Sequence, residues 1–301
     1  MTIATKFEAC ILAGAIGDAI GSQHESTVPD DPHTLYPFGK PPLAQSGWRI
    51  TDDTQLTLAT IEAWNECTTF SAPAIAEAMT DVYATKRLIG AGASTIKALQ
   101  ELQVGGDWSQ VGRRGEFAAG NGAAMRIAPL AFDPRIGDAD IRDICFITHR
   151  NDEAYIGAKC VVLMIREAVH GKLLSTEVAM KSLASKLPDT NVRDRILQLA
   201  TMTSIADAAA LGCSGYVVDS VPLAIYAALT VGMVDLRGMY TQLIEVGGDT
   251  DTNCSIAGQI VGAARGVQSI PTSLKTQLMK LPEYAEITSS IQRFRVNPPW
   301  S

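Results

Sequence analysis

The chain has 301 residues, of which 47% are hydrophobic and 19% are charged, a composition typical of a globular protein with a substantial apolar core. Its formal net charge of −7 offers no basic patch for nucleic acid or for an anionic membrane. The six cysteines form no C-x-x-C pair and have no zinc-ligand spacing with the four histidines, which favours reduced, buried thiols. Residues 1–10 lack the pattern of a signal peptide, so we expect a cytoplasmic protein.

Most segments have a helical period, and β-branched alternation is scarce, so the sequence predicts an all-α fold. No linker or solenoid repeat divides the chain, and we therefore expect a single domain over 1–301. In chain order, the helical runs are 9–21, 54–64, 71–87, 94–103, 152–171, 175–187, 191–212, 221–234 and 254–266. The most apolar stretch, 217–234, approaches the length of a membrane span, but Asp219 and Pro222 interrupt it, and we expect a buried helix.

One segment between the first two helical runs resists a helical interpretation. Residues 22–47 carry several prolines and little periodicity. Loops longer than about 12–15 residues in compact domains are commonly lids or binding loops, or are disordered. Because this segment contains Glu25 and ends just before an acidic string, we predict a lid over that string.

Two short acidic strings carry the main chemical signal. The first is Thr51-Asp52-Asp53-Thr54, in which Thr51 is a good N-cap and both aspartates fall in the first turn of the following helix. The second, Gly247-Gly248-Asp249-Thr250-Asp251-Thr252, also precedes a helical run. Two like charges about 4 Å apart repel by roughly 4 kcal/mol at an effective dielectric near 20. Either the strings lie apart, or they hold a hard cation such as Mg²⁺ or Mn²⁺.

Glycines at four-residue spacing indicate how the second string is held. The series Gly258, Gly262 and Gly266 predicts close approach of its helix to a neighbouring helix, which would fix the two acidic strings against each other. A second pair, Gly17 and Gly21, has the same spacing.

With these strings the chain resembles the ADP-ribosylglycohydrolase family along nearly its whole length. Seven segments in the family's order carry the resemblance: 14–21 with Glu25, 51–54, 90–92, 120–126, 148–149, 220–222 and 247–252. The resemblance implies a single-domain orthogonal helical bundle that binds two Mg²⁺ or Mn²⁺ ions. The implied metal ligands are Thr51, Asp52, Asp53, Asp249, Asp251 and Thr252.

The resemblance also implies hydrolysis at C1″ of an ADP-ribose whose terminal ribose lies over the metals. The implied catalytic residues are Glu25, Asp52 and Asp251, of which Glu25 matches the family's mobile glutamate. Glycosidases usually divide acid and base work between two carboxyl groups, which agrees with this set. Asp18 either acts behind the metal ligands or caps the first helix.

The implied substrate-binding residues come from Gly-rich and aromatic segments: Gly90, Ala91, Gly92, Gly120, Asn121, Gly122, His149, Gly215 and Tyr216. Glycine turns before a helix can aim backbone N–H groups at a diphosphate, although each such turn alone also fits an ordinary loop. His149 borders the ribose side in the family, and it also fits a capping position before Asn151. Tyr216 offers a ring for adenine, with a core tyrosine as the alternative. Arg126 is expected to pair with an acid in the core.

The function implied is metal-dependent removal of ADP-ribose from an acceptor, with ADP-ribose or an ADP-ribosylated protein as the partner. Gly90 stands where one branch of the family has an aspartate, which argues against strict arginine specificity, and a nucleic-acid acceptor is left open. The alternatives are a non-catalytic ADP-ribose-binding or toxin-immunity protein and a hydrolase of free O-acetyl-ADP-ribose. We expect a monomer with no membrane attachment.

Overall fold

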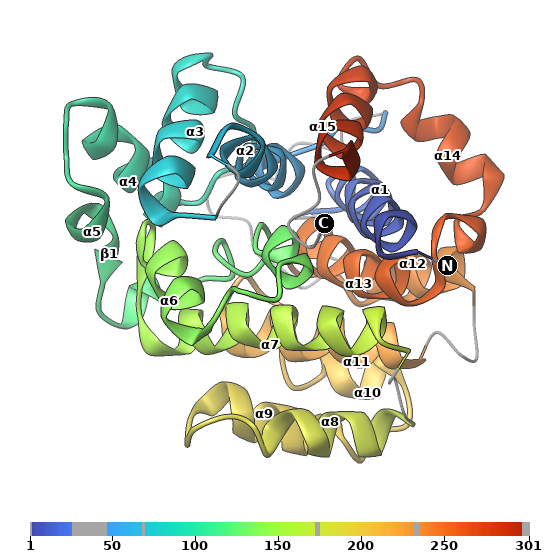
Figure 1. Cartoon of the computed structure of the whole chain (residues 1–301). Coiled ribbons are helices and arrows are strands. Elements are labelled where there is room, and N and C mark those ends of the chain that lie inside the picture. Colours follow the sequence, from blue (N-terminus) through green and yellow to red (C-terminus); the bar gives the residue numbers. More distant parts are fainter. Residues whose placement is uncertain (1, 26–46, 68–69, 172–174, 231–234, 297–301) are drawn as a thin grey trace, which may run out of the picture.

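The computed structural model describes residues 2–25, 47–67, 70–171, 175–230 and 235–296, which fold almost entirely into helices (Figure 1). The first half contains α1 (Ile3–Gly21), α2 (Asp52–Cys67), α3 (Ala72–Ala84), α4 (Ala93–Gln103), α5 (Trp108–Val111), α6 (Asp138–Phe146) and α7 (Asp152–Val169). The second contains α8 (Thr176–Ala184), α9 (Asn191–Leu199), α10 (Ile205–Ala209), α11 (Val217–Thr230), α12 (Leu236–Val246), α13 (Thr250–Arg265), α14 (Thr272–Leu278) and α15 (Tyr284–Val296). The all-α prediction is confirmed.

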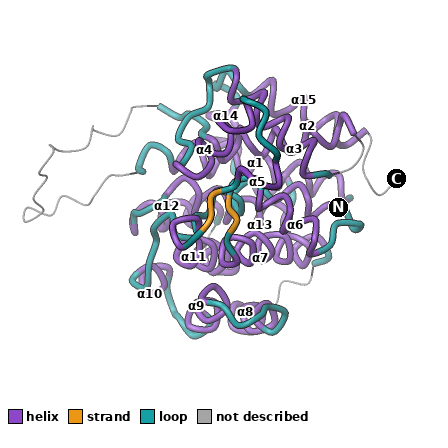
Figure 2. The backbone as a smooth tube through the Cα atoms, turned by 90° about the vertical axis from the view of Figure 1, so that its left-hand side faces the viewer, coloured by secondary structure: helices purple, strands orange, loops and turns teal. Residues whose placement is uncertain are grey.

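The remaining elements are short. The 3₁₀ turns are η1 (Glu116–Ala118), η2 (Ala128–Phe132) and η3 (Val267–Ser269). Two strands of two residues each, β1 (Arg113–Arg114) and β2 (His149–Arg150), pair in parallel with Arg113 opposite His149. Figure 2 shows them as the two orange segments among the helices. This pairing brings His149 beside the chain that leads into the 120–122 turn.

The most extensive packing in the structure is between α1 and α13, which lie together at its centre (Figure 1). Glycines on both helices permit it: a Cβ on Gly17 would overlap the carbonyl of Cys254, and one on Gly262 would overlap the carbonyl of Ala9. The predicted close approach of the Gly258–Gly262 series is therefore confirmed. Gly266 differs, because it follows the end of α13 with φ +73° and stops the helix.

This packing decides where the acidic strings lie. Near the last turn of α1, a Cβ on Gly21 would overlap the carbonyl of Thr250, and the Thr250 hydroxyl donates to the Gly21 carbonyl at 2.8 Å. The beginning of α13 therefore lies beside the end of α1, and Glu25 follows α1 by only four residues. The segment predicted as a lid, 22–47, lies outside the described residues except for its ends at 22–25 and Gly47.

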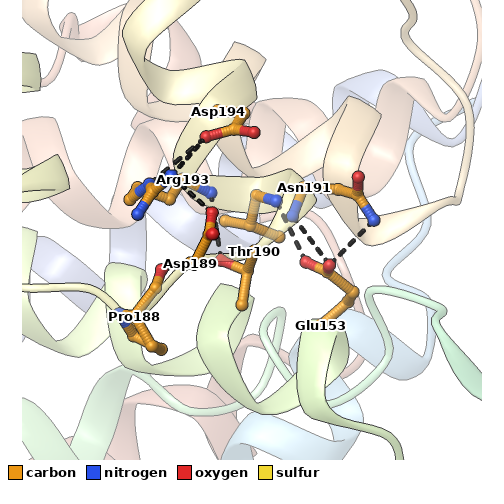
Figure 3. Close-up of polar contacts among 8 residues, drawn as sticks. Glu153, Pro188, Asp189, Thr190, Asn191, Arg193 and Asp194 are labelled. Atoms are coloured by element: carbon orange, nitrogen blue, oxygen red, sulfur yellow. Dashed lines mark hydrogen bonds and ion pairs between the residues drawn. The ribbon is translucent and has the colours of Figure 1, made fainter.

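A layer made by α8 and α9 lies outermost, below α7 in Figure 1. Glu153 of α7 holds it in place, because its carboxylate accepts hydrogen bonds from the backbone N–H of Asn191 at 2.8 Å and of Val192 at 3.0 Å (Figure 3). The side-chain amide of Asn191 adds a third at 2.9 Å. These donors belong to the first turn of α9, so a carboxylate from another helix caps it.

The predicted helical run over 191–212 is wrong in one respect, because the chain breaks it between α9 and α10. Thr201 donates to the carbonyl of Gln198 at 3.2 Å, and the hydroxyl of Ser204 accepts the N–H of Asp207 at 3.0 Å. Here side-chain hydroxyls bind the backbone groups that would pair with each other in a continuous helix, and Ser204 is the N-cap of α10.

The apolar stretch over 217–234 forms the buried helix α11 as far as Thr230. No helix within the described ranges is both long and apolar enough to cross a membrane. The six cysteines form no disulfide; four are buried, whereas Cys67 is exposed and Cys213 is half-buried.

Candidate active site

The first acidic string lies where the sequence predicts it, since α2 begins at Asp52 and has Asp52 and Asp53 in its first turn. The capping acceptor, however, is Asp18 of α1. Its carboxylate accepts the backbone N–H of Thr51 at 3.0 Å and of Thr54 at 3.1 Å, together with both threonine hydroxyls at 2.7 and 2.5 Å. Thr51 donates its hydroxyl instead of accepting with it. Asp18 therefore caps α2, whereas Thr2 caps α1.

The second acidic string leads into α13 through Gly247 and Gly248, whose φ angles of +74° and +79° favour glycine. Asp249 donates its backbone N–H to the carbonyl of Cys213 at 2.9 Å and accepts the side-chain amide of Asn121 at 2.8 Å. The segment after Cys213 also binds the 120–122 turn, because Asn121 donates its N–H to the Gly215 carbonyl at 3.1 Å. The acidic string and the glycine turn are thus held by one connecting segment.

The two strings meet. The hydroxyl of Thr252 donates to Oδ2 of Asp53 at 3.1 Å, a contact between residues 199 apart in sequence. Glu25, Asp249 and Asp251 each offer a carboxylate oxygen, and these three oxygens lie within 4.8 Å of one another. The structure therefore excludes the alternative that the acidic strings lie apart.

Electrostatics in this cluster is unfavourable for ionised carboxylates. Burial raises the pKa of Asp52, Asp53 and Asp251 well above the usual value, and the charges of neighbouring aspartates raise it further. The pKa of Glu25 is raised by burial and then by Asp249. No ion pair in the described part of the chain includes any of the three aspartates. Oδ1 of Asp53 is buried without a hydrogen-bond partner.

A cavity of about 310 Å³ opens over the cluster. Its walls come from the predicted acidic and glycine segments and from the ends of α4 and β2. The lining residues are Glu25, Asp52, Asp53, Gly90, Gly92, Ala93, Ser94, Thr95, Arg113, Phe117, Gly120, Asn121, Gly122, Met125, His149, Gly215, Asp249, Asp251 and Thr252. Three predicted site residues, Thr51, Ala91 and Tyr216, are absent from this lining.

Glycines of the site make room for side chains of the site itself. Gly90 has φ +83°, and a Cβ there would lie 3.1 Å from Oδ1 of Asp52. A Cβ on Gly215 would lie 2.9 Å from Oδ2 of Asp249. A Cβ on Gly122 would lie 2.9 Å from Cε1 of His149, within the cavity wall. Larger residues would therefore displace the acids or fill the cavity.

Sequence reasoning missed the exposed ring of Phe117, and it named the glycines before α4 but not the residues of the first turn of α4 that line the cavity. Phe117 is 75% exposed, which is unusual for a phenylalanine, and it stands three residues before Gly120. The closeness of Phe117 to the glycine motif in the sequence could have indicated that its ring lies at the site. Arg126 was expected to pair with an acid in the core. No ion pair of the described residues includes it, and it donates to the Gly122 carbonyl and to Thr148 instead, while the charge of Asp52 acts on its pKa without a direct contact.

Comparisons with known proteins identify the family of the chain and its fold. Residues 1–298 match the family model described as ADP-ribosylglycohydrolase. ADP-ribosylhydrolase ARH3 of Gallus gallus is 24% identical, over 95% of this chain and 92% of that protein. ADP-ribosylarginine hydrolase Tri1 of Pseudomonas putida is 25% identical, over 88% and 72%. A solved structure titled ADP-ribosylglycohydrolase-related protein complex has the same fold, with a TM-score of 0.73, 23% identity and 98% coverage of both chains.

Proposed function

Because this chain belongs to the ADP-ribosylglycohydrolase family, we propose that its cavity holds the ADP-ribose part of an ADP-ribosylated substrate and that the enzyme hydrolyses the C1″ bond to the acceptor. The observation that supports this proposal best is the meeting of two acidic strings under one cavity. None of Asp52, Asp53 and Asp251 belongs to an ion pair among the described residues, and carboxylates gathered in this way are costly to fold, which is typical of sites that bind cations or do chemistry.

The donor set fits divalent metal ions. It consists only of oxygen atoms, and Oδ1 of Asp53, which accepts no hydrogen bond, has its lone pairs free to bind a cation. The proposed ligands are those that the family resemblance implies: Thr51, Asp52, Asp53, Asp249, Asp251 and Thr252. The Thr51 hydroxyl donates its hydrogen to Asp18, so only the lone pairs of its oxygen are left for a metal ion. When bound, two Mg²⁺ or Mn²⁺ ions would neutralise the carboxylates and supply Lewis acidity toward the ribose hydroxyls.

Glu25 is the proposed acid and base. Its raised pKa lets the carboxyl keep a proton closer to neutral pH than an ordinary glutamate does. In the protonated form it can give that proton to the leaving atom at C1″, and in the ionised form it can take one from the attacking water. Asp52 and Asp251, the other two proposed catalytic residues, line the same cavity and would act by holding the metal ions beside the ribose.

The diphosphate is proposed to lie between the start of α4 and the 120–122 turn. Gly92 is the N-cap of α4 and offers no side-chain acceptor, so the N–H groups of the first turn remain for an anion. Ser94, Thr95 and Gly122 line the cavity there. The ribose next to the diphosphate is proposed to contact His149. The remaining proposed contacts of the ligand are Gly90, Ala91, Gly120, Asn121 and Gly215.

The base of the nucleotide is proposed to meet Phe117. This ring is exposed and lines the cavity, and an aromatic face suits a flat heterocycle. Tyr216, the residue that the sequence favours for this role, is 41% exposed and lies one residue beyond the lining residue Gly215.

The acceptor is decided by assay. One relative's name specifies arginine and the other names no linkage, so the names of the relatives do not fix the acceptor of this chain. Arginine-, serine- and O-acetyl-linked ADP-ribose are incubated with the purified enzyme, with and without Mg²⁺ or Mn²⁺, and the products are identified by mass spectrometry. We expect free ADP-ribose only with metal. Binding of ADP-ribose without release from any linkage would favour the non-catalytic alternative, and release from the O-acetyl ester alone would favour a small-molecule hydrolase.

A further inference from the structure

Arg126 is a buried cation whose hydrogen bonds all go to carbonyl and hydroxyl oxygens. It is 0% exposed, and no ion pair of the described residues includes it. Its guanidinium donates to three acceptors: the carbonyl of Gly122, the hydroxyl of Thr148 at 2.8 Å and the carbonyl of Ile144 at 3.4 Å. Burial lowers its pKa to about 10, which still leaves it charged at neutral pH. Because a buried charge is costly unless it is hydrogen-bonded, Arg126 and its three acceptors hold one another in place.

The hydroxyl of Thr148 connects Arg126 to His149. Arginine N–H groups only donate, so the oxygen of Thr148 accepts from Arg126. The same oxygen lies 2.7 Å from Nδ1 of His149. No other acceptor for the Thr148 hydroxyl hydrogen is found among the described residues, and a buried hydroxyl without an acceptor is unfavourable. Thr148 therefore donates to Nδ1, which in that case carries no proton.

An imidazole that accepts at Nδ1 carries its proton at Nε2 when it is neutral. Burial, helped by the charges of Arg126 and Arg113, lowers the pKa of His149 to about 3, so the ring is neutral throughout the physiological range. Nε2 has no hydrogen-bond partner in the described part of the chain, and His149 lines the cavity. A Cβ on Gly120 or Gly122 would lie 3.2 or 3.3 Å from Nε2, so the bare backbone of the turn exposes this edge of the ring.

We propose that Arg126 and Thr148 are positioning residues that fix His149 as the Nε2–H tautomer, so that it presents a neutral hydrogen-bond donor to an oxygen of the bound ligand. The nature of that ligand rests on the proposed function, but the tautomer does not. Arg126 also holds the Gly122 carbonyl, so a single guanidinium sets both the histidine and the turn opposite it. His149 therefore serves as a donor and not as a general base.

The tautomer is measured directly by long-range ¹H–¹⁵N correlation spectra of protein labelled at its four histidines, from pH 6 to 8, without ligand or metal. The His149 signals are assigned from their loss in His149→Gln. We expect a protonated Nε2 and an unprotonated Nδ1 at each pH. A proton at Nδ1, or a positively charged ring, would overturn the proposal without bearing on the proposed function.

Variants at Thr148 test the connection. Thr148→Val removes the donor to Nδ1, and we expect a shift toward the Nδ1–H form together with about fivefold to tenfold weaker ADP-ribose binding by calorimetry, the scale of one hydrogen bond. Thr148→Ser keeps a hydroxyl and should restore both. The matched control is Thr60→Val, which removes another buried hydroxyl, one that bonds only to the Leu56 carbonyl at 2.9 Å. It should change neither the tautomer nor the affinity.

The outcomes separate the two proposals. If Thr148→Val keeps the Nε2–H form, or keeps full affinity after the tautomer has shifted, the positioning role is refuted. If Thr148→Val does not fold, Thr148→Ala provides the same comparison, and the spectrum of the parent still decides the tautomer. If no variant, the parent included, binds ADP-ribose while the parent spectrum shows Nε2–H, the proposed function fails and the tautomer assignment stands.

Discussion

Two regions of this molecule place carboxylates at the beginnings of helices, and they treat the charge in opposite ways. At the start of α9, the carboxylate of Glu153 accepts hydrogen bonds from two backbone N–H groups and a side-chain amide. In the same region Arg193 forms ion pairs with Asp189 and Asp194 (Figure 3). At the starts of α2 and α13, the aspartates face one another, and burial and mutual repulsion raise their pKa values. The acids at α9 are thus satisfied by donors and cations of the protein itself, whereas Asp52, Asp53 and Asp251 have no ion pair among the described residues, which is why we propose a metal partner for them.

Asp18 belongs to the acidic cluster of the candidate site by position, but its carboxylate caps a helix as Glu153 does. Burial raises the pKa of Asp18, and the hydrogen bonds from four donors of Thr51 and Thr54 to its carboxylate offset part of that rise. The number of hydrogen bonds that a carboxylate accepts therefore indicates its role better than its position in an acidic cluster does.

The largest effect is expected for Asp251→Asn, which removes a charge from the middle of the cluster. Turnover should fall toward the upper end of the roughly 10²- to 10⁴-fold range for catalytic groups, and metal affinity should fall as well. The matched control is Asp194→Asn in the α9 layer, where an exposed ion pair is worth at most about 1 kcal/mol. Steady-state kinetics and metal titration compare the two; equal losses would erase the contrast between the regions.

Glu25→Gln separates chemistry from binding. We expect turnover to fall by roughly 10²-fold, the scale of general acid–base assistance, while ADP-ribose binds nearly as tightly as before. The reason is that Glu25 lines the cavity but lies outside the proposed ligand set for the metals. Single-turnover rates and calorimetric titration measure the two effects, and near-normal turnover would remove Glu25 from the mechanism.

Gly122→Val tests the wall opposite the acids. A side chain there would press on His149 and enter the cavity, so we expect at least about tenfold weaker binding of ADP-ribose, a change of about 1.4 kcal/mol, with the metals retained. Free ribose, which lacks the diphosphate, should be affected less. Unchanged ADP-ribose affinity in a variant with the parent circular dichroism spectrum would make the turn purely structural.

The smallest effect is expected for Glu153→Gln in the structural region. It weakens a helix cap, so the free energy of unfolding should fall by about 1 kcal/mol, whereas turnover stays at the parent value. Urea unfolding and the kinetic assay are compared on the same preparation. A loss of turnover without a loss of stability would assign Glu153 to the functional region.

The sequence predicted those parts of the site that depend on neighbours along the chain. Thr51 before two aspartates located the start of α2, and Gly247-Gly248 before a helical run located the start of α13. The Gly258–Gly262 spacing predicted the packing that brings them together. The cap of α2 by Asp18 could not be predicted in this way, because donor and acceptor lie 33 to 36 residues apart. The partners of Arg126 were missed for the same reason, since a buried cation held by carbonyls leaves no charge pattern in the sequence.

Other expectations stay predictions. The lid over 22–47 lies mostly outside the described residues, and the single domain, the monomeric state and the cytoplasmic location each need their own experiment. The individual ligand and substrate contacts are proposals that the variants above address one by one.

The central claim is that the acidic cluster requires divalent metal, and thermal unfolding with chelator, Mg²⁺ or Mn²⁺ at pH 5 and pH 8 tests it most directly. Because the folded-state pKa values of Asp52, Asp53 and Asp251 are raised, their contribution to stability is full below the unfolded value near 4 and is lost as the pH rises. Metal at about 100 times its Kd should stabilise the protein by about 2.7 kcal/mol and raise the melting temperature by several degrees. The rise should be larger at pH 8, where protons no longer compete. Equal melting temperatures in all conditions, with no metal found by elemental analysis, would contradict the account.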